Sequence, residues 1–277
     1  MVAPALRTHR LTDPAANKPL LLVGPGIGTG VQELWNTTAQ HLADDFEVIG
    51  YNLPGHAGAP AHTDPYSVKE LADAAAALVA DQPAERRIYF AGVSISGGVA
   101  MELALHHPER FAAVAVVCSA PKIGEPEAWE ERAQAAAANG TEIMVPFCRE
   151  GWFAPGFIDE NPAQSDALLD NLRQADLASY VTICRALGTY DVRADLATVT
   201  IPVLTINGAH DHVCPPSEGA TIAAGVPHGK AVTFNHVAHL APRRRPRTHS
   251  RRTPTLLPRV GLGDGGESSG SWGSRLS

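Results

Sequence analysis

Residues 90–111, FAGVSISGGVAMELALHHPERF, decide how this sequence is interpreted, because they place two serines between a strand and a helix. The pattern G-x-S-x-G puts a serine on a sharp strand-to-helix turn, with its hydroxyl exposed above the end of a sheet. Neither serine matches the pattern completely. Ser94 has Gly92 before it and Ser96 after it, whereas Ser96 has Ser94 before it and Gly98 after it.

The flanking sequence favours Ser94 as the residue at the turn. In this register the apolar strand at 87–93 ends where the turn begins, and residues 97–107 supply the helix. The strand and helix backbones nearly touch there, so the positions two residues before and after the turn require small side chains, of which glycine is the smallest. We therefore expect Ser94 to carry the exposed hydroxyl and Ser96 to be the small residue after it. A glycine- and serine-rich turn without chemistry is the alternative for the motif alone.

Strands and helices alternate on both sides of this turn. Further strands are predicted at 19–24, 46–52, 111–120, 201–208 and 231–239, and further helices at 31–45, 67–82 and 217–226. Ser67 and Glu70 have the spacing of a capping box at the start of the second helix. The alternation predicts the α/β class, with a mostly parallel central sheet and helices on both faces.

One region breaks this alternation. Residues 122–190 contain several helical segments and no convincing strand, which indicates a helical cap inserted into the α/β unit. We therefore divide the chain into a first core part at 1–121, the cap at 122–190, a second core part at 191–242 and a tail at 243–277.

The tail differs in composition from the rest of the chain. It carries eight arginines against Asp264 and Glu267, whereas the other residues comprise 14 basic and 27 acidic side chains. Proline, glycine and serine dominate it, and such a segment buries too little apolar surface to offset the entropy of ordering. We expect it to be disordered or loosely attached; a basic arm for an anionic partner is the functional alternative.

Composition excludes several classes of protein. The 277 residues fit one α/β unit with an insertion, and no apolar run approaches the ~20 residues of a membrane span. The acidic body gives no support to nucleic-acid binding, and the N-terminus lacks the apolar core of a signal peptide. We expect a cytoplasmic protein with a small-molecule substrate and four reduced, mostly buried thiols, namely Cys118, Cys148, Cys184 and Cys214.

A serine nucleophile needs a base and an acid that orients the base. Asp211 follows an apolar strand, at the edge where a parallel sheet holds its ligand-facing loops, and His239 comes 28 residues later after another short strand. The chain order Ser94, Asp211, His239 is that of a Ser-Asp-His catalytic triad on this type of sheet. For each residue taken singly, the more common case is a turn residue for Asp211 and a surface histidine for His239; their combination with the turn at Ser94 and the chain order favours the triad.

Other histidines near Asp211 are rivals for these roles. His210 and His212 flank Asp211 with a spacing that can bind metal, but no further ligand cluster accompanies them. His236 lies earlier, on the strand that precedes His239. We assign all three to loop or supporting roles and expect neither a metal nor a cofactor.

The oxyanion hole is expected from two backbone N–H groups. One follows the nucleophile, at Ile95, and the other belongs to the glycine-rich turn GPGIGTG at 24–30, at Ile27. A phosphate cradle is the rival interpretation of this turn. The turn lacks the G-x-G-x-x-G pattern and the lysine of a P-loop, so it is weak as a nucleotide site.

These motifs together resemble the α/β-hydrolase family and, within it, the 3-oxoadipate enol-lactonases of aromatic-compound catabolism. Besides residues 90–111, the resemblance over about residues 15–242 is carried by GPGIGTGVQELW, YNLPGHAGAP, WFAPGF, SYVTICRALGTYDVRADL, IPVLTINGAHDHVCPP and VAHLAP. In members of this family, the proline of the HPER segment follows the nucleophilic serine of the strand-to-helix turn by fourteen residues, which is the separation of Ser94 and Pro108.

The resemblance implies hydrolysis of 3-oxoadipate enol-lactone to 3-oxoadipate by the triad, without a cofactor. The remaining carboxylate of this substrate needs a cation, for which the cap offers Arg132, Arg149 and Arg185. The pocket walls are expected at Trp129, Trp152 and Phe153. For each arginine a solvated position on a helix is the more common case, and packing within the cap explains the three aromatic residues equally well. The alternatives are another carboxylesterase or a cofactor-free perhydrolase of the same fold, and a non-catalytic or inactivated member.

The sequence departs from the family pattern in several places. Ser96 and Ala57 stand where glycine is usual, and His210 stands where an acidic residue is frequent, so Asp211 is the carboxylate of its loop. After residue 242 the family continues with an acidic loop and a helix, whereas this chain changes abruptly to the basic tail. A change of reading frame in the gene would produce such a switch, and reading the DNA in the other frames tests this hypothesis.

Overall fold

The computed structural model describes residues 3–243. The expectations for the basic tail therefore lie outside the described residues, apart from Arg243. Among residues 3–243, no helix is both long and apolar enough to cross a membrane.

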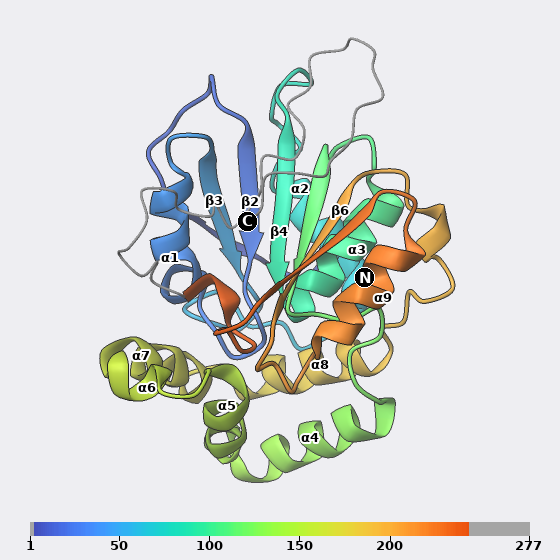
Figure 1. Cartoon of the computed structure of the whole chain (residues 1–277). Helices are drawn as coiled ribbons and strands as arrows, with labels where there is room; N and C mark the ends of the chain where they lie inside the picture. The colour runs from blue at the N-terminus through green and yellow to red at the C-terminus, as the bar shows by residue number, and fades with distance from the viewer. Residues whose placement is uncertain (1–2, 244–277) are drawn as a thin grey trace.

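A seven-stranded sheet forms the centre of the molecule (Figure 1). Its order is β1-β3-β2-β4-β5-β6-β7, and every pairing is parallel except that of β1 with β3. The strands are β1 (Arg7–Arg10), β2 (Leu20–Gly24), β3 (Glu47–Asn52), β4 (Ile88–Val93), β5 (Ala113–Val117), β6 (Val203–Gly208) and β7 (Gly229–Phe234). The predicted α/β class with a mostly parallel sheet is confirmed.

The strand order explains why both faces of the sheet are covered. The chain first steps from β2 to β3 in one direction and then proceeds through β4, β5, β6 and β7 in the other. Because crossovers between parallel strands are right-handed, the first helix lies on one face and the later helices lie on the opposite face. Figure 1 shows α1 (Val31–Leu42) on the left and α2 (Val68–Ala77), α3 (Ile95–His106) and α9 (Pro216–Gly225) on the right.

The point where the strand order reverses lies between β2 and β4. In open parallel sheets, ligands bind beyond the carboxyl ends of the strands at this position. The loop after β2 is the glycine-rich turn, and the loop after β4 carries Ser94. The topology therefore brings the two predicted halves of the oxyanion hole together.

Local sequence patterns account for these elements. All five residues of β2 are buried, as expected for a central parallel strand. Helix α1 buries Val31, Leu34, Trp35 and Leu42 on one face. The predicted capping box is confirmed, because the Ser67 hydroxyl accepts from the Glu70 N–H and the Glu70 carboxylate accepts from the Ser67 N–H.

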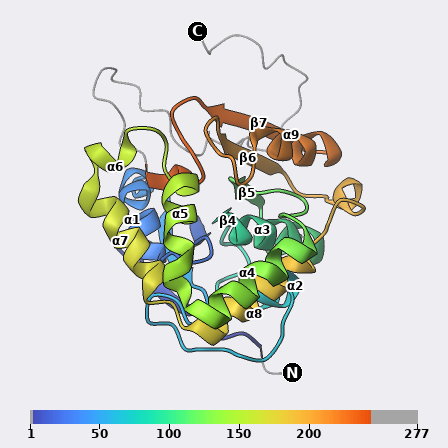
Figure 2. The same cartoon turned by 90° about the horizontal axis from the view of Figure 1, so that it is seen from below.

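Five α-helices between β5 and β6 cover the carboxyl ends of the strands (Figures 1 and 2). They are α4 (Pro126–Asn139), α5 (Val145–Trp152), α6 (Phe157–Glu160), α7 (Pro162–Arg173) and α8 (Leu177–Gly188), with the short 3-10 helix η1 (Thr141–Met144) between α4 and α5. The two ends of this insertion meet, because Lys122 forms a β-bridge with Asp191 and the Val192 N–H donates to the Pro121 carbonyl at 2.8 Å.

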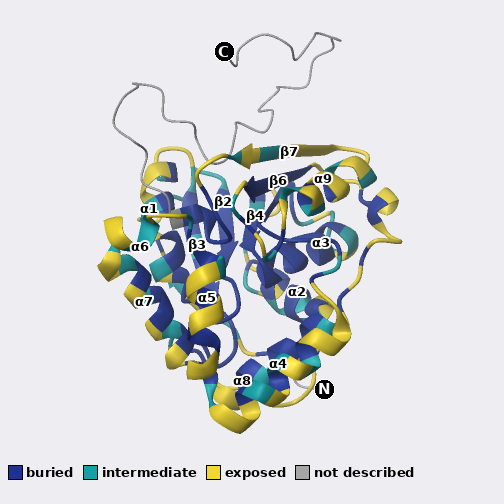
Figure 3. Cartoon of the chain, turned by 60° about the horizontal axis from the view of Figure 1, so that its bottom comes forward, coloured by how far each residue is buried: buried dark blue, intermediate teal, exposed yellow. Residues whose placement is uncertain are grey.

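The buried residues of the insertion are those on the sides of its helices that face the rest of the molecule. Figure 3 shows buried residues on the sides of α4, α7 and α8 that face the body of the molecule, and exposed residues on their outer sides.

Two further 3-10 helices, η2 (Leu196–Thr198) and η3 (Ala241–Arg243), complete the described elements. The prediction of buried, free thiols is confirmed at Cys118, Cys148, Cys184 and Cys214.

β1 has no counterpart among the strands predicted from the sequence. Its four residues, RTHR, have no apolar alternation, and their burial pattern is mostly exposed. β1 is the edge strand of the sheet and is held by antiparallel pairing with β3, from Arg7 opposite Asn52 to Arg10 opposite Ile49. An edge strand with both faces near solvent needs no apolar pattern, so this element left no signal of the kind used for the others.

Candidate active site

Ser94 occupies the turn between β4 and α3 in a strained backbone conformation. Its φ is 57° and its ψ is −119°, a region that costs a residue with a Cβ on the order of 1–3 kcal/mol. The surroundings hold it there, because the Ser94 carbonyl accepts from the N–H groups of Gly97 (2.7 Å) and Gly98 (3.1 Å) and from the Ser119 hydroxyl (2.8 Å). The turn is therefore held in the geometry of a nucleophile elbow.

The strand and the helix pack so closely at Gly92 that this position has no room for a side chain. A Cβ at Gly92 would lie 1.9 Å from the backbone oxygen of Ser96, so the strand and the helix touch at this point. Ser96 itself is fully buried in the first turn of α3. Its hydroxyl donates to the carbonyl oxygen of Pro25 at 2.6 Å and so is turned away from any position of attack.

Asp211 and His239 lie together beside this turn, as the sequence analysis expected. The His239 Nδ1 is 2.9 Å from Asp211 Oδ2, and both side chains are almost completely buried. A carboxylate only accepts hydrogen bonds, so Nδ1 carries the proton and Nε2 has the free lone pair of a general base. The other carboxylate oxygen accepts from the N–H groups of Val213 (2.8 Å) and Cys214 (2.9 Å), which fixes its orientation.

Backbone packing joins the loops that carry this pair. Gly208 ends β6, and a Cβ there would lie 2.5 Å from the carbonyl oxygens of Val237 and Ala238. One residue before Asp211, the His210 N–H donates to the Val237 carbonyl at 2.9 Å. The loop after β6 and the segment before His239 therefore form one unit at the edge of the sheet.

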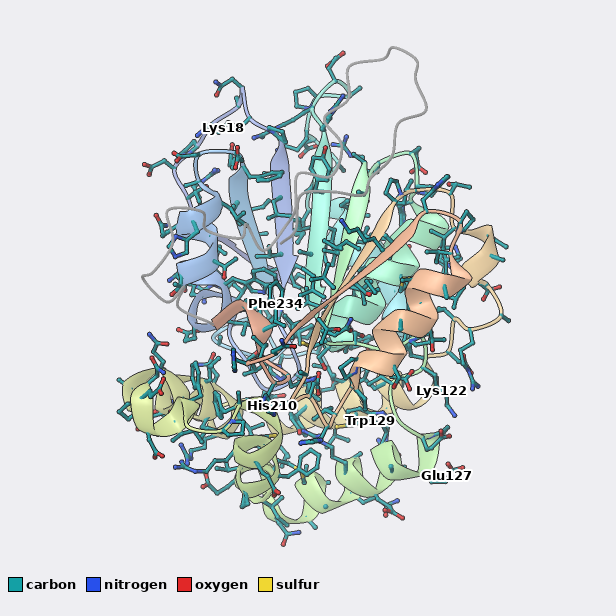
Figure 4. All side chains as sticks on the ribbon, viewed as in Figure 1. Lys18, Lys122, Glu127, Trp129, His210 and Phe234 are labelled. Atoms are coloured by element: carbon teal, nitrogen blue, oxygen red, sulfur yellow. The ribbon has the colours of Figure 1, made fainter. Side chains whose placement is uncertain are left out.

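A pocket lies between these loops and the cap and contains both Ser94 and His239. It encloses about 380 Å³ of empty space, including the part open to solvent. Figure 4 shows Trp129 on α4 and His210 after β6 at the border between cap and sheet. The residues that line the pocket are Gly26, Ile27, Ser94, Ile123, Trp129, Arg132, Phe147, Trp152, Val213, His239 and Leu240.

Two backbone N–H groups are available at this pocket. Ile95 is the first residue of α3, and the N–H of a first helical residue has no partner within its helix. The N–H of Ile27 has no hydrogen-bond acceptor among the described residues, and Ile27 lines the pocket. The glycine-rich turn runs close to Ser94, because a Cβ at Gly26 would lie 3.5 Å from the Ser94 Cβ. This is the arrangement expected for an oxyanion hole.

Arg132 brings a positive charge into the pocket. Its guanidinium donates to the Tyr180 hydroxyl through Nε (2.8 Å) and Nη2 (2.5 Å) and lies over the rings of Trp129 and Phe147 at 5.3 and 5.5 Å from their centroids. Burial raises the pKa of Tyr180, so this partner is neutral. No carboxylate within residues 3–243 forms an ion pair with Arg132.

The structure does not bring every predicted residue into the pocket. Phe153 is stacked on Phe157 at 5.5 Å and lines a separate small cavity with His236. Arg149 is exposed, and Arg185 pairs with Glu130 at the surface. Trp129 and Trp152 do line the pocket, as expected.

The supporting histidines also lie outside the pocket lining. His210 is half-buried and His212 is exposed. The expectation that His236 lies on the last strand was wrong, because β7 ends at Phe234 and His236 is an exposed turn residue. Within the described part of the chain, no group of three or more His, Cys, Asp or Glu residues is placed to hold a metal ion.

Several residues of the pocket were not predicted from the sequence. Phe147, Ile123, Val213 and Leu240 reach it from four different segments, and none belongs to a motif with catalytic spacing. The hydrogen bond from Ser96 to Pro25, which joins residues 71 positions apart, was not predicted either. Ala57 was noted as a departure from glycine, and its φ of 44° is the left-handed conformation that glycine adopts most readily.

Comparison with known proteins gives consistent matches. Residues 20–248 match the alpha/beta hydrolase family. The chain is 32% identical over 227 residues to 3-oxoadipate enol-lactonase 2 of Acinetobacter baylyi, covering 81% of this chain and 84% of that protein. It is 27% identical over 233 residues to a pimeloyl-[acyl-carrier protein] methyl ester esterase of Vibrio atlanticus, covering 79% and 86%.

A solved structure is also similar. The enol-lactonase from Burkholderia xenovorans LB400 superposes with a TM-score of 0.80 at 25% identity, covering 85% of this chain and 90% of that one. The similarity in fold therefore extends over the sheet and the cap together.

Proposed function

Since the chain belongs to the alpha/beta hydrolase family, we propose that it hydrolyses a small anionic enol-lactone of the 3-oxoadipate type. Ser94 is the nucleophile, His239 the general base and acid, and Asp211 the residue that orients His239. The N–H groups of Ile27 and Ile95 form the oxyanion hole. We further propose that the enzyme needs no cofactor and acts in aromatic-compound catabolism in the cytoplasm, with residues 122–190 as the cap over its substrate.

The observation that carries this proposal is the position of Arg132. A guanidinium without a carboxylate partner among the described residues lines the same pocket as Ser94 and His239. Guanidinium groups bind carboxylates through strong, charge-assisted hydrogen bonds. An anionic substrate supplies the missing negative charge. A neutral ester leaves the cation without a charged partner, so this feature favours an anionic lactone over a neutral ester.

The first half-reaction opens the lactone ring. Ser94 Oγ attacks the lactone carbonyl carbon while its proton passes to Nε2 of His239, and the oxyanion forms against the two N–H groups. The ring C–O bond then breaks, and the leaving enol oxygen takes the proton from His239. The enol tautomerises to the ketone, which makes the opening hard to reverse.

The second half-reaction releases the acid. His239 takes a proton from water, the resulting hydroxide oxygen attacks the acyl carbon, and the bond to Ser94 Oγ breaks as Ser94 regains a proton from His239. The product is a 3-oxo dicarboxylic acid and the free enzyme. The carboxylate of Asp211 stabilises the imidazolium at both stages and stays ionised.

Two other functions share parts of this site. Another carboxylesterase, or a cofactor-free perhydrolase, would use the same triad on a neutral substrate, and a non-catalytic member would keep the pocket without turnover. Similarity to pimeloyl-[acyl-carrier protein] methyl ester esterases keeps the esterase alternative in view. The 32% sequence identity with the enol-lactonase and the charge of Arg132 both favour a lactone as the substrate.

The test is hydrolysis of 3-oxoadipate enol-lactone by the purified chain and by Ser94→Ala. We expect turnover by the wild type and a loss of at least about 10³-fold in the variant, since removal of a triad nucleophile leaves only residual catalysis. Hydrolysis of neutral esters without the lactone would favour the esterase alternative. A folded wild type without any hydrolytic activity would contradict the proposal.

A further inference from the structure

Three consecutive carbonyl groups of the glycine-rich turn are held by side-chain donors. Gly24 O accepts from the indole N–H of Trp35 at 3.0 Å, Pro25 O from the hydroxyl of Ser96 at 2.6 Å, and Gly26 O from the hydroxyl of Thr29 at 2.8 Å. All three donors are buried. The turn is therefore anchored at each of the peptide groups that lead to Ile27.

These bonds fix the direction of the N–H groups that follow. A trans peptide is planar, and its C=O and N–H point in opposite directions. The carbonyl of Pro25 therefore sets the direction of the Gly26 N–H, and the carbonyl of Gly26 sets that of the Ile27 N–H. The Gly26 carbonyl also accepts from the Thr29 N–H at 3.1 Å.

Ser96 differs from the other two donors because it belongs to the nucleophile helix. It lies two residues after Ser94 and one after Ile95, so its hydroxyl ties the turn directly to the element that carries the nucleophile and the second N–H group. The Ser96 hydroxyl thereby links the two segments that carry the proposed N–H groups of the oxyanion hole.

Tyr51 completes a one-directional chain of hydrogen bonds. The Tyr51 hydroxyl lies 3.0 Å from Ser96 Oγ, and both groups are fully buried. Ser96 has one hydroxyl proton, which goes to the Pro25 carbonyl because a carbonyl only accepts. Tyr51 must therefore donate to Ser96, and the chain runs from Tyr51 to Ser96 to Pro25. The site has no spare room, since a Cβ at Gly24 would lie 2.5 Å from both hydroxyl oxygens.

We infer that Ser96, supported by Tyr51, is a positioning residue: it holds the Pro25–Gly26 peptide of the glycine-rich turn against α3, and so keeps the next N–H of the turn, that of Ile27, within reach of the oxyanion formed at Ser94. This rests on the proposed function in that Ser94 is taken as the nucleophile and the Ile27 N–H as a donor to the oxyanion, and it is independent of the identity of the substrate. Glycine at position 96 has no hydroxyl, so the side chain of Ser96 adds an interaction that the G-x-S-x-G pattern does not provide.

The test compares Ser96→Ala, Tyr51→Phe and the double variant, with p-nitrophenyl acetate as a general ester probe. Misplaced oxyanion donors cost about 10–100-fold in rate, so we expect kcat of Ser96→Ala to decrease by about tenfold with KM nearly unchanged. Tyr51→Phe keeps the hydrogen bond from Ser96 to Pro25, so its kcat should decrease by less than about threefold. Binding of phenylboronic acid, which forms a tetrahedral adduct with Ser94, should weaken in parallel with kcat.

The double variant separates positioning from stability. Ser96→Ala leaves the buried Tyr51 hydroxyl without a partner, and Tyr51→Phe removes that hydroxyl. We expect the double variant to regain part of the lost melting temperature while kcat stays low. Ser165→Ala is a matched control, because it removes another fully buried serine hydroxyl bonded to backbone carbonyls, in α7.

Several results would overturn this inference. They are a kcat for Ser96→Ala equal to that of the wild type, a kcat that recovers with the melting temperature, and a loss in Ser165→Ala as large as in Ser96→Ala. Failure of the proposed function is seen separately, as an enol-lactone that is not hydrolysed while ester hydrolysis still depends on Ser94. A wild type that neither hydrolyses the ester nor binds the boronic acid would overturn both.

Discussion

The guanidinium of Arg132 lies in the pocket without a carboxylate partner in the part of the chain that the structure describes, and this residue sets the expected substrate charge. Loss of a hydrogen bond to a charged group costs about 1.5–3 kcal/mol. We therefore predict that Arg132→Gln lowers kcat/KM for the anionic enol-lactone by about 10–100-fold, mainly through KM. Steady-state kinetics with p-nitrophenyl acetate as a neutral substrate should show little change.

Tyr180→Phe is the control for this prediction. It removes the hydroxyl that accepts from Arg132 but keeps the charge and the aromatic ring. The kcat/KM of Tyr180→Phe for the lactone should therefore decrease much less than that of Arg132→Gln. An equal loss for the neutral and the anionic substrate in Arg132→Gln would show that Arg132 supports the cap structurally and does not bind the substrate carboxylate.

The contact between β4 and α3 gives a prediction at the scale of elements. In Gly92→Ala the added Cβ would overlap the backbone of Ser96 at 1.9 Å, and backbone cannot move aside as a side chain can. We expect a loss of unfolding free energy of about 3 kcal/mol or more. Chemical denaturation measures it against Gly188→Ala, in which the new Cβ would lie 3.5 Å or more from its nearest neighbours, an ordinary van der Waals contact. Equal losses would contradict the close contact.

Helix α3 also carries a buried acid, which makes its stability depend on pH. Burial raises the pKa of Glu102 to about 7 from the ordinary 4.5, and the like charges of Asp195 and Asp73 add to this while Lys69 opposes it. His106 Nε2 lies 3.2 Å from its carboxylate. The folded chain therefore binds the proton more tightly than the unfolded chain, so the free energy of unfolding falls as pH rises from 4.5 to about 7.

Glu102→Gln removes this dependence. We predict that the variant is more stable than the wild type by about 1–3 kcal/mol at pH 8 and that the difference disappears near pH 4. Thermal denaturation across this pH range measures the effect. Glu109→Gln, an exposed acid on the same segment, serves as the control and should show no such trend. A variant that is less stable at pH 8 would mean that the pair with His106 outweighs the cost of burial.

At the scale of the whole molecule, the sequence predicted what depends on local pattern. Apolar runs and helical spacing identified the strands β2 to β7 and the helices around them, because burial imposes those patterns. Ser94, Asp211 and His239 could be placed together because the carboxyl ends of parallel strands share one edge. The structure adds the 2.9 Å contact of His239 with Asp211, which no spacing rule supplies.

What escaped prediction depends on packing between distant segments. The pocket lining brings together Ile123, Phe147 and Leu240 from segments with no common motif. Trp152 lines both the pocket and the small cavity beside it, whereas Phe153, the next residue, lines only the small cavity, and the sequence does not distinguish the two. The hydrogen bond from Ser96 to Pro25 could not be predicted from the sequence alone, because a serine hydroxyl has many possible partners and only the fold brings these two residues together.

The most direct test of the account is labelling with a fluorophosphonate, which forms a covalent bond with an activated serine. Mass spectrometry of the digested protein should find one adduct, on Ser94. Labelling should vanish in Ser94→Ala and persist, more slowly, in Ser96→Ala. An adduct on Ser96, or a folded wild type that takes up no label, would contradict the assignment of Ser94 as the nucleophile and with it the proposed hydrolysis.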